Sequence, residues 1–92
     1  MTKIKAYSFR IYGLVQGVAF RYSARREANS LNLSGWIRNQ SDGSVEGFVE
    51  GDEDKVKVFI EWCHKGPVTA KVEKVILKES TPQNLRGFEI KY

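Results

Sequence analysis

The chain has 92 residues, of which 41% are hydrophobic and 28% are charged, and its formal net charge at pH 7 is +4. This composition excludes a disordered chain and predicts a single globular domain, residues 1–92, that buries one sizeable core and favours anionic partners. Cys63 is the only cysteine, which excludes an intramolecular disulfide and a cysteine-rich metal cluster and fits a reducing cytoplasm.

The first half of the chain predicts a strand, a helix and a hairpin. Residues 4–12 alternate between two faces, as in a strand with one apolar side. Because the sequence has no apolar run of the required length, neither a signal peptide nor a membrane-spanning stretch is expected. Residues 19–31 place apolar side chains three or four positions apart, as in an amphipathic helix, and Asn32 suits the left-handed conformation at its end. Residues 35–39 and 44–50 flank an Asp-Gly turn, which indicates a hairpin.

The second half predicts another helix and two strands. Acidic residues at 52–54 begin a helix whose apolar stripe ends at Cys63, and Pro67 prevents the helix from resuming. Strands are expected at residues 70–77 and around Phe88. The order βαββαβ predicts a split βαβ arrangement, with an antiparallel sheet and both helices on one face. Three aromatic residues are expected in the core: Phe20, Trp36 and Phe48.

The stretch between the first strand and the first helix has the features of an anion-binding turn. It reads Gly13-Leu14-Val15-Gln16-Gly17-Val18-Ala19-Phe20-Arg21. Glycine lets the backbone approach a ligand closely, free N–H groups at a helix start point outward, and a guanidinium group suits phosphate or carboxylate. The spacing matches neither the Walker loop nor the dinucleotide-binding glycine motif. These residues alone fit an anion site and an ordinary glycine turn equally well.

Three segments resemble one enzyme family. The stretch from Gly13 to Arg21 is similar to the first signature of the acylphosphatase family. Gly35-Trp36-Ile37-Arg38-Asn39, with Asp42-Gly43 and Val45-Glu46 after it, is similar to the second signature at the expected distance downstream. The closing residues 87–92 are similar to the family's C-terminal strand. The resemblance covers essentially the whole chain and implies a ferredoxin-like α+β fold.

The resemblance implies hydrolysis of the carboxyl-phosphate bond of a small acyl phosphate, giving a carboxylate and inorganic phosphate without a metal or a cofactor. Arg21 matches the family's phosphate-binding arginine, and Asn39 matches its water-positioning asparagine. The Gln16 side chain is expected to shape the loop rather than to touch the ligand. A cytoplasmic monomer with no membrane partner is the expected form. The resemblance also implies that backbone N–H groups of the loop bind the phosphate together with Arg21; these belong to Val15, Gln16, Gly17, Val18, Ala19 and Phe20.

Two other functions fit parts of the chain. A basic domain with this order of elements is also typical of RNA-recognition modules, but residues 46–50 lack their basic residue and second stacking aromatic, so nucleic acid is not the expected partner. The third candidate is a carbamoyl-phosphate-handling domain similar to the acylphosphatase-like module of hydrogenase maturation proteins. Because the sequence ends at Tyr92 without a partner domain, a stand-alone enzyme is expected.

Several polar residues also have plainer interpretations. Without the resemblance, Asn39 would be an ordinary residue beside a turn. Cys63 and His64 point in different directions on a helix, and no further histidine or cysteine could complete a metal or nucleophile site. Asp42 and Glu46 are expected in a turn and on a solvated face rather than as a catalytic pair. Arg25, Arg26 and Arg38 are expected to be solvated charges, with steering of an anionic substrate as the alternative.

Overall fold

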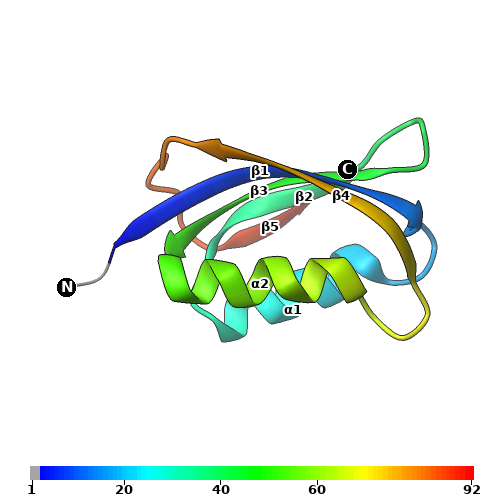
Figure 1. Ribbon diagram of the computed structural model, residues 1–92, viewed down its shortest axis with the longest axis horizontal. Helices are drawn as coiled ribbons and strands as arrows, with labels where there is room; N and C mark the ends of the chain where they lie inside the picture. The colour runs from blue at the N-terminus through cyan, green and yellow to red at the C-terminus, as the bar shows by residue number, and fades with distance from the viewer. Residues whose placement is uncertain (1–2) are drawn as a thin grey trace.

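The computed structural model describes residues 3–92, so the first two residues of the predicted domain lie outside the described range. The strands form one sheet in the order β4-β1-β3-β2-β5, and both helices cover the same face of it (Figure 1). The predicted ferredoxin-like α+β fold is therefore confirmed. Its elements are β1 (Ile4–Leu14), α1 (Phe20–Ser30), β2 (Ser34–Asn39), β3 (Val45–Asp52), α2 (Glu53–Lys65), β4 (Lys71–Ser80) and β5 (Phe88–Lys91).

The last strand makes the sheet mixed. The pairs β1–β3, β1–β4 and β2–β3 are antiparallel, as predicted, but β5 pairs with β2 in parallel. Because β4 and β5 lie at opposite edges of the sheet, the segment of residues 81–87 that connects them must pass from one edge to the other, and it does so at one end of the sheet (Figure 1). The carboxylate of Glu50, which is only 5% exposed, accepts hydrogen bonds from the backbone N–H groups of Gln83 and Leu85, both at 2.5 Å. Glu50 therefore fastens the crossing segment to β3.

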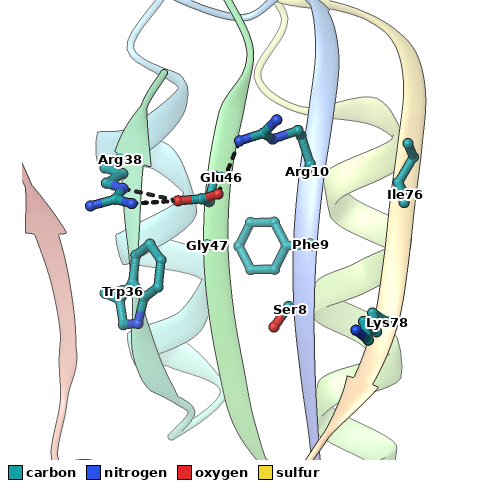
Figure 2. A pocket seen from close by; sticks show the side chains of 9 residues that line it. All are labelled: Ser8, Phe9, Arg10, Trp36, Arg38, Glu46, Gly47, Ile76 and Lys78. Atoms are coloured by element: carbon teal, nitrogen blue, oxygen red, sulfur yellow. Dashed lines mark hydrogen bonds and ion pairs between the residues drawn. The ribbon is translucent and has the colours of Figure 1, made fainter. Parts of the chain in front are cut away.

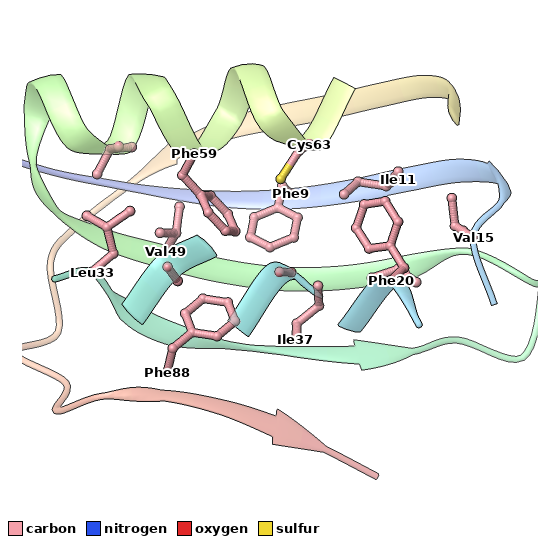
Figure 3. Close-up of a cluster of buried hydrophobic side chains, with 14 residues drawn as sticks. Phe9, Ile11, Val15, Phe20, Leu33, Ile37, Val49, Phe59, Cys63 and Phe88 are labelled. Carbon is pink, nitrogen blue, oxygen red and sulfur yellow. The ribbon is translucent and has the colours of Figure 1, made fainter. Parts of the chain in front are cut away.

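The core lies between the helices and the sheet (Figure 3). Phe59 of α2 meets Phe9 of β1 edge to face, with ring centroids 5.8 Å apart. Phe20 is 1% exposed, which confirms its predicted place. The prediction that Trp36 lies in the core is wrong. The fully buried Ile37 is the residue of β2 that faces the helices, and because adjacent residues of a strand point to opposite faces, Trp36 faces away from them.

The helix ends follow their local sequence. Asn32 follows α1 with φ 56°, which confirms the left-handed conformation expected there. Asp52 precedes α2, and its side chain accepts a hydrogen bond from Asp54 N at 3.0 Å. Gly66 ends α2 with φ 69°. Both helices therefore begin and end within two residues of the predicted positions.

Gly13 brings β1 into the loop that follows it. It has φ 128° beside an irregularity in the β1–β4 pairing, and a Cβ there would lie 2.1 Å from Lys71 O. We expect Gly13→Ala to lower the free energy of unfolding by about 3 kcal/mol, measured by urea denaturation. Gly87→Ala is the control, because Gly87 has φ 71° but open space around it, and its loss should be about 1 kcal/mol. Equal losses would contradict the role of the contact with β4.

Candidate active site

The loop between β1 and α1 presents a row of backbone donors. Gly17 and Ala19 both have positive φ, 74° and 62°, while Val18 between them does not. Alternation of this kind turns successive N–H groups toward one side and forms a concave anion nest. Within residues 3–92, the N–H groups of 16–19 donate to no protein acceptor. The first intrahelical bond of α1 is donated by Ser23 to Ala19 O at 3.0 Å, so the donors of the first helical turn are also available.

Side chains fix the loop from both sides. Val15 and Phe20, at its two ends, are each 1% exposed and belong to the core (Figure 3). The Gln16 amide donates to Gln40 O at 2.7 Å and to Ser44 O at 2.9 Å, which joins the loop to the turn between β2 and β3. Both amide hydrogens of Gln16 are thus engaged within the protein. The expectation that this side chain shapes the loop is confirmed.

Arg21 lies in the first turn of α1, as predicted. Its guanidinium Cζ is 5.1 Å from the centroid of the Tyr92 ring, within range of a cation–π contact. No carboxylate among residues 3–92 forms an ion pair with it. A fixed, uncompensated guanidinium beside unbonded N–H groups is an arrangement that can bind an oxyanion.

Asn39 ends β2, opposite Val45 of β3. Its amide oxygen is buried and accepts no hydrogen bond within the described part of the chain. The next residue, Gln40, receives the Gln16 bond, so Asn39 adjoins the point where the loop is fastened. In the parallel pairing of β2 with β5, Arg38 lies opposite Lys91, which places Asn39 one position further, toward Tyr92. The fold therefore brings the two predicted catalytic residues to one end of the sheet.

A hollow of about 190 Å³ lies at this end of the molecule. The loop and Arg21 form one side of it, and Ile90 and Tyr92 of the C-terminal segment form another. Two further residues of α1, Tyr22 and Arg25, also border the hollow. From the sequence, Arg25 is expected to be a solvated charge, with steering of an anionic substrate as the alternative, and is not expected to line the site. Its spacing of four from Arg21, which puts both on one side of a helix, is the signal that could have placed it here.

A larger hollow, of about 440 Å³, lies on the face of the sheet that the helices leave open (Figure 2). Here the two arginines, Arg10 and Arg38, are neutralised within the protein. One carboxylate oxygen of Glu46 accepts a hydrogen bond from Arg10 Nη2 at 3.0 Å (Figure 2). The other oxygen contacts Arg38 Nη2 at 2.8 Å and accepts a hydrogen bond from Arg38 Nε at 2.9 Å (Figure 2). Trp36 borders this hollow, with the Arg38 guanidinium over its ring at 5.3 Å. The smaller hollow is therefore the one whose arginines form no ion pair with any residue of the described range 3–92.

The remaining polar candidates have structural roles. Asp42 accepts hydrogen bonds from Ser44 Oγ and Ser44 N within the turn, which hold the pKa of its carboxyl below the usual range. Its place in a turn is confirmed, whereas Glu46 is ion-paired rather than simply solvated. Burial raises the pKa of the Cys63 thiol well above its usual value, and His64 Nδ1 lies 3.0 Å from Ile60 O. Residues 3–92 contain no cluster of three His, Cys, Asp or Glu suited to a metal ion.

None of the helices described in residues 3–92 combines the length and apolar character needed to cross a membrane.

Comparison with known proteins identifies the family. The family model for Acylphosphatase matches residues 7–90. The acylphosphatase of Thermococcus kodakarensis is 47% identical over 98% of each chain. The acylphosphatase structure from Bacillus subtilis is 35% identical with a TM-score of 0.92, over 98% of this chain and 100% of that one. The structure of T. kodakarensis HypF is 38% identical with a TM-score of 0.83, but the match covers 96% of this chain and only 12% of HypF. The resemblance seen in the sequence is confirmed, and the chain belongs to the acylphosphatase family.

Proposed function

We propose that this protein hydrolyses small acyl phosphates, with the loop and Arg21 binding the phosphoryl group and Asn39 positioning the attacking water. The observation that carries the proposal is the buried amide oxygen of Asn39, which has no partner in residues 3–92 although it adjoins the fastened loop. A buried acceptor without a partner costs free energy and calls for an explanation. A water held there for the reaction provides one.

The loop supplies donors in a fixed arrangement. In phosphoryl transfer, negative charge is spread over three equatorial oxygens of the transferred group. Donors that are already oriented stabilise this charge without reorganising during the reaction. The nest around Gly17 and Ala19 has such donors, and Arg21 adds a guanidinium group that can bind two oxygens at once. The phosphate-binding residues in this proposal are Val15, Gln16, Gly17, Val18, Ala19 and Phe20, through their N–H groups, and Arg21.

The Asn39 amide oxygen accepts a hydrogen bond from the water and orients it toward phosphorus. The water oxygen bonds to phosphorus while the bond from phosphorus to the carboxyl oxygen breaks, and the carboxylate leaves with the electron pair. An amide is too weakly basic to take the proton, which passes instead to a phosphate oxygen and yields inorganic phosphate. A carboxylate leaves readily without protonation, so this route uses neither a general acid nor a metal ion.

The carbamoyl-phosphate-handling domain, the third candidate from the sequence, remains the alternative, because this chain is also similar to a 12% part of the larger protein HypF at 38% identity. The T. kodakarensis acylphosphatase matches over 98% of its own length, which favours the stand-alone enzyme. The single, monomeric and cytoplasmic domain stays a prediction.

The test is phosphate release from benzoyl phosphate by the purified chain, with and without EDTA. We expect turnover well above the uncatalysed rate and the same rate in both conditions, because the proposed route uses no metal. A rate abolished by EDTA and restored by a divalent cation would contradict the metal-free route. A folded chain that releases no phosphate would contradict the proposed activity, and salt-sensitive binding of RNA would then be measured.

A further inference from the structure

The start of α1 carries an unfavourable arrangement of charge. Arg21 and Arg25 lie four residues apart, so two cations repel each other on one side of the helix. The positive end of the helix dipole adds to this repulsion, and the first turn contains no acidic residue. Among residues 3–92, no ion pair compensates either arginine. Arg10 and Arg38, by contrast, share the carboxylate of Glu46.

Aromatic rings, rather than carboxylates, contact these two guanidinium groups. Arg21 lies 5.1 Å from the ring of Tyr92, and Arg25 lies 5.3 Å from the ring of Tyr22. A ring beneath the plane of a guanidinium group limits its motion and leaves the N–H edge available for an anion. All four side chains border the same hollow of about 190 Å³. The hollow therefore presents two separate guanidinium groups to its contents.

Arg21 and Arg25 extend from successive turns of α1. In the proposed function, the loop and Arg21 surround the transferred phosphoryl group. Arg25 is one helical turn, about 5.4 Å, further along α1. A group that reaches Arg25 while the phosphoryl group occupies the loop must belong to the acyl part of the substrate. Because a guanidinium group binds carboxylate and phosphate best, that part should carry a second anion.

We infer that Arg25 selects acyl phosphates whose acyl group carries a second anionic group, either a carboxylate or a phosphate. The inference rests on the proposed function, because it takes the loop and Arg21 as the site of the transferred phosphoryl group. It assigns to Arg25 a specificity role that is separate from bond cleavage.

The test compares three substrates: benzoyl phosphate, with no second anion, succinyl phosphate, with a carboxylate, and 3-phosphoglyceroyl phosphate, with a second phosphate. Arg25→Gln is expected to lower kcat/KM for at least one of the two anionic substrates about 10- to 100-fold, mainly through KM. Benzoyl phosphate should change less than about threefold. Arg25→Lys, which keeps the charge, should recover part of the loss.

Arg26→Gln is the matched control. It removes the same charge from the adjacent position, but Arg26 borders a different hollow, together with Glu27. We expect it to leave the ratio of kcat/KM between anionic and neutral substrates unchanged. Circular dichroism will establish that each variant is folded.

Three results would overturn the inference: equal losses for all substrates in Arg25→Gln, an equal change in Arg26→Gln, or a wild-type chain with no preference for either anionic substrate. Equal losses for all substrates would mean that Arg25 binds the transferred phosphoryl group. An equal change in Arg26→Gln would mean that Arg25 acts only by long-range electrostatic steering. Failure of the folded wild-type chain to hydrolyse any of the three would overturn the proposed function itself.

Discussion

Replacement of Arg21 by alanine is expected to lower kcat/KM for benzoyl phosphate about 10³-fold or more, because the transition state loses its only proposed cationic partner. The protein should remain folded. Arg21 forms no ion pair within residues 3–92, and the described contact that its guanidinium loses is the one with the Tyr92 ring. The measurement is steady-state phosphate release, with thermal unfolding of the same samples as the check on folding.

Two further variants separate the geometry of Arg21 from its charge. Arg21→Lys keeps a positive charge but loses the planar fork, so it should recover only a small part of the activity. Arg26→Ala removes a charge from the same helix outside the hollow and should retain nearly all of it. Inorganic phosphate, the product, should inhibit Arg21→Ala much more weakly than the wild type. Near-normal turnover by a folded Arg21→Ala variant would contradict its assignment.

The elements of this fold could be predicted because each has a local cause. The alternation in residues 4–12, the acidic start of α2 and the left-handed tendency of Asn32 all act over a few residues. The parallel pairing of β5 could not be predicted in this way. It depends on a crossing segment that Glu50 fastens through two backbone N–H groups, and no periodicity in the sequence encodes such a long-range contact.

Trp36 illustrates a second limit of the sequence. Adjacent residues of a strand face opposite sides, and Trp36 and Ile37 are both apolar. Only the position of the helices decides which of the two is buried, and the structure buries Ile37. The aromatic character of Trp36 suggested the core, whereas its ring lies on the open face with Arg38 and Lys91 against it.

Only part of the candidate site could be predicted from the sequence. The loop and Arg21 are contiguous, so their proximity follows from chain order. Asn39 and the C-terminal Tyr92 reach the same end of the sheet through pairing between strands, and only the resemblance to a family indicated Asn39 beforehand. The amide oxygen of Asn39 has no partner among the residues that the structure describes, and this is a property of the folded protein because it depends on which groups surround the oxygen.

Replacement of Asn39 by alanine is expected to lower kcat for benzoyl phosphate about 100-fold or more, with little change in the inhibition constant of inorganic phosphate. The amide orients the water rather than holding the phosphoryl group, so its loss should affect the reaction more than binding. Rapid-quench measurement of a single turnover will show whether the chemical step is the one that slows. Weaker phosphate binding with an unchanged kcat would contradict this role.

Stability gives an independent test of the same residue. An amide that served the fold would lose a hydrogen bond on truncation and destabilise the protein. The Asn39 oxygen has no such bond within residues 3–92, and truncation removes a buried polar atom together with its desolvation cost. We therefore expect Asn39→Ala to unfold at the same urea concentration as the wild type or a higher one. A loss of activity without a loss of stability would mean that this buried oxygen is kept for the reaction at the expense of the fold.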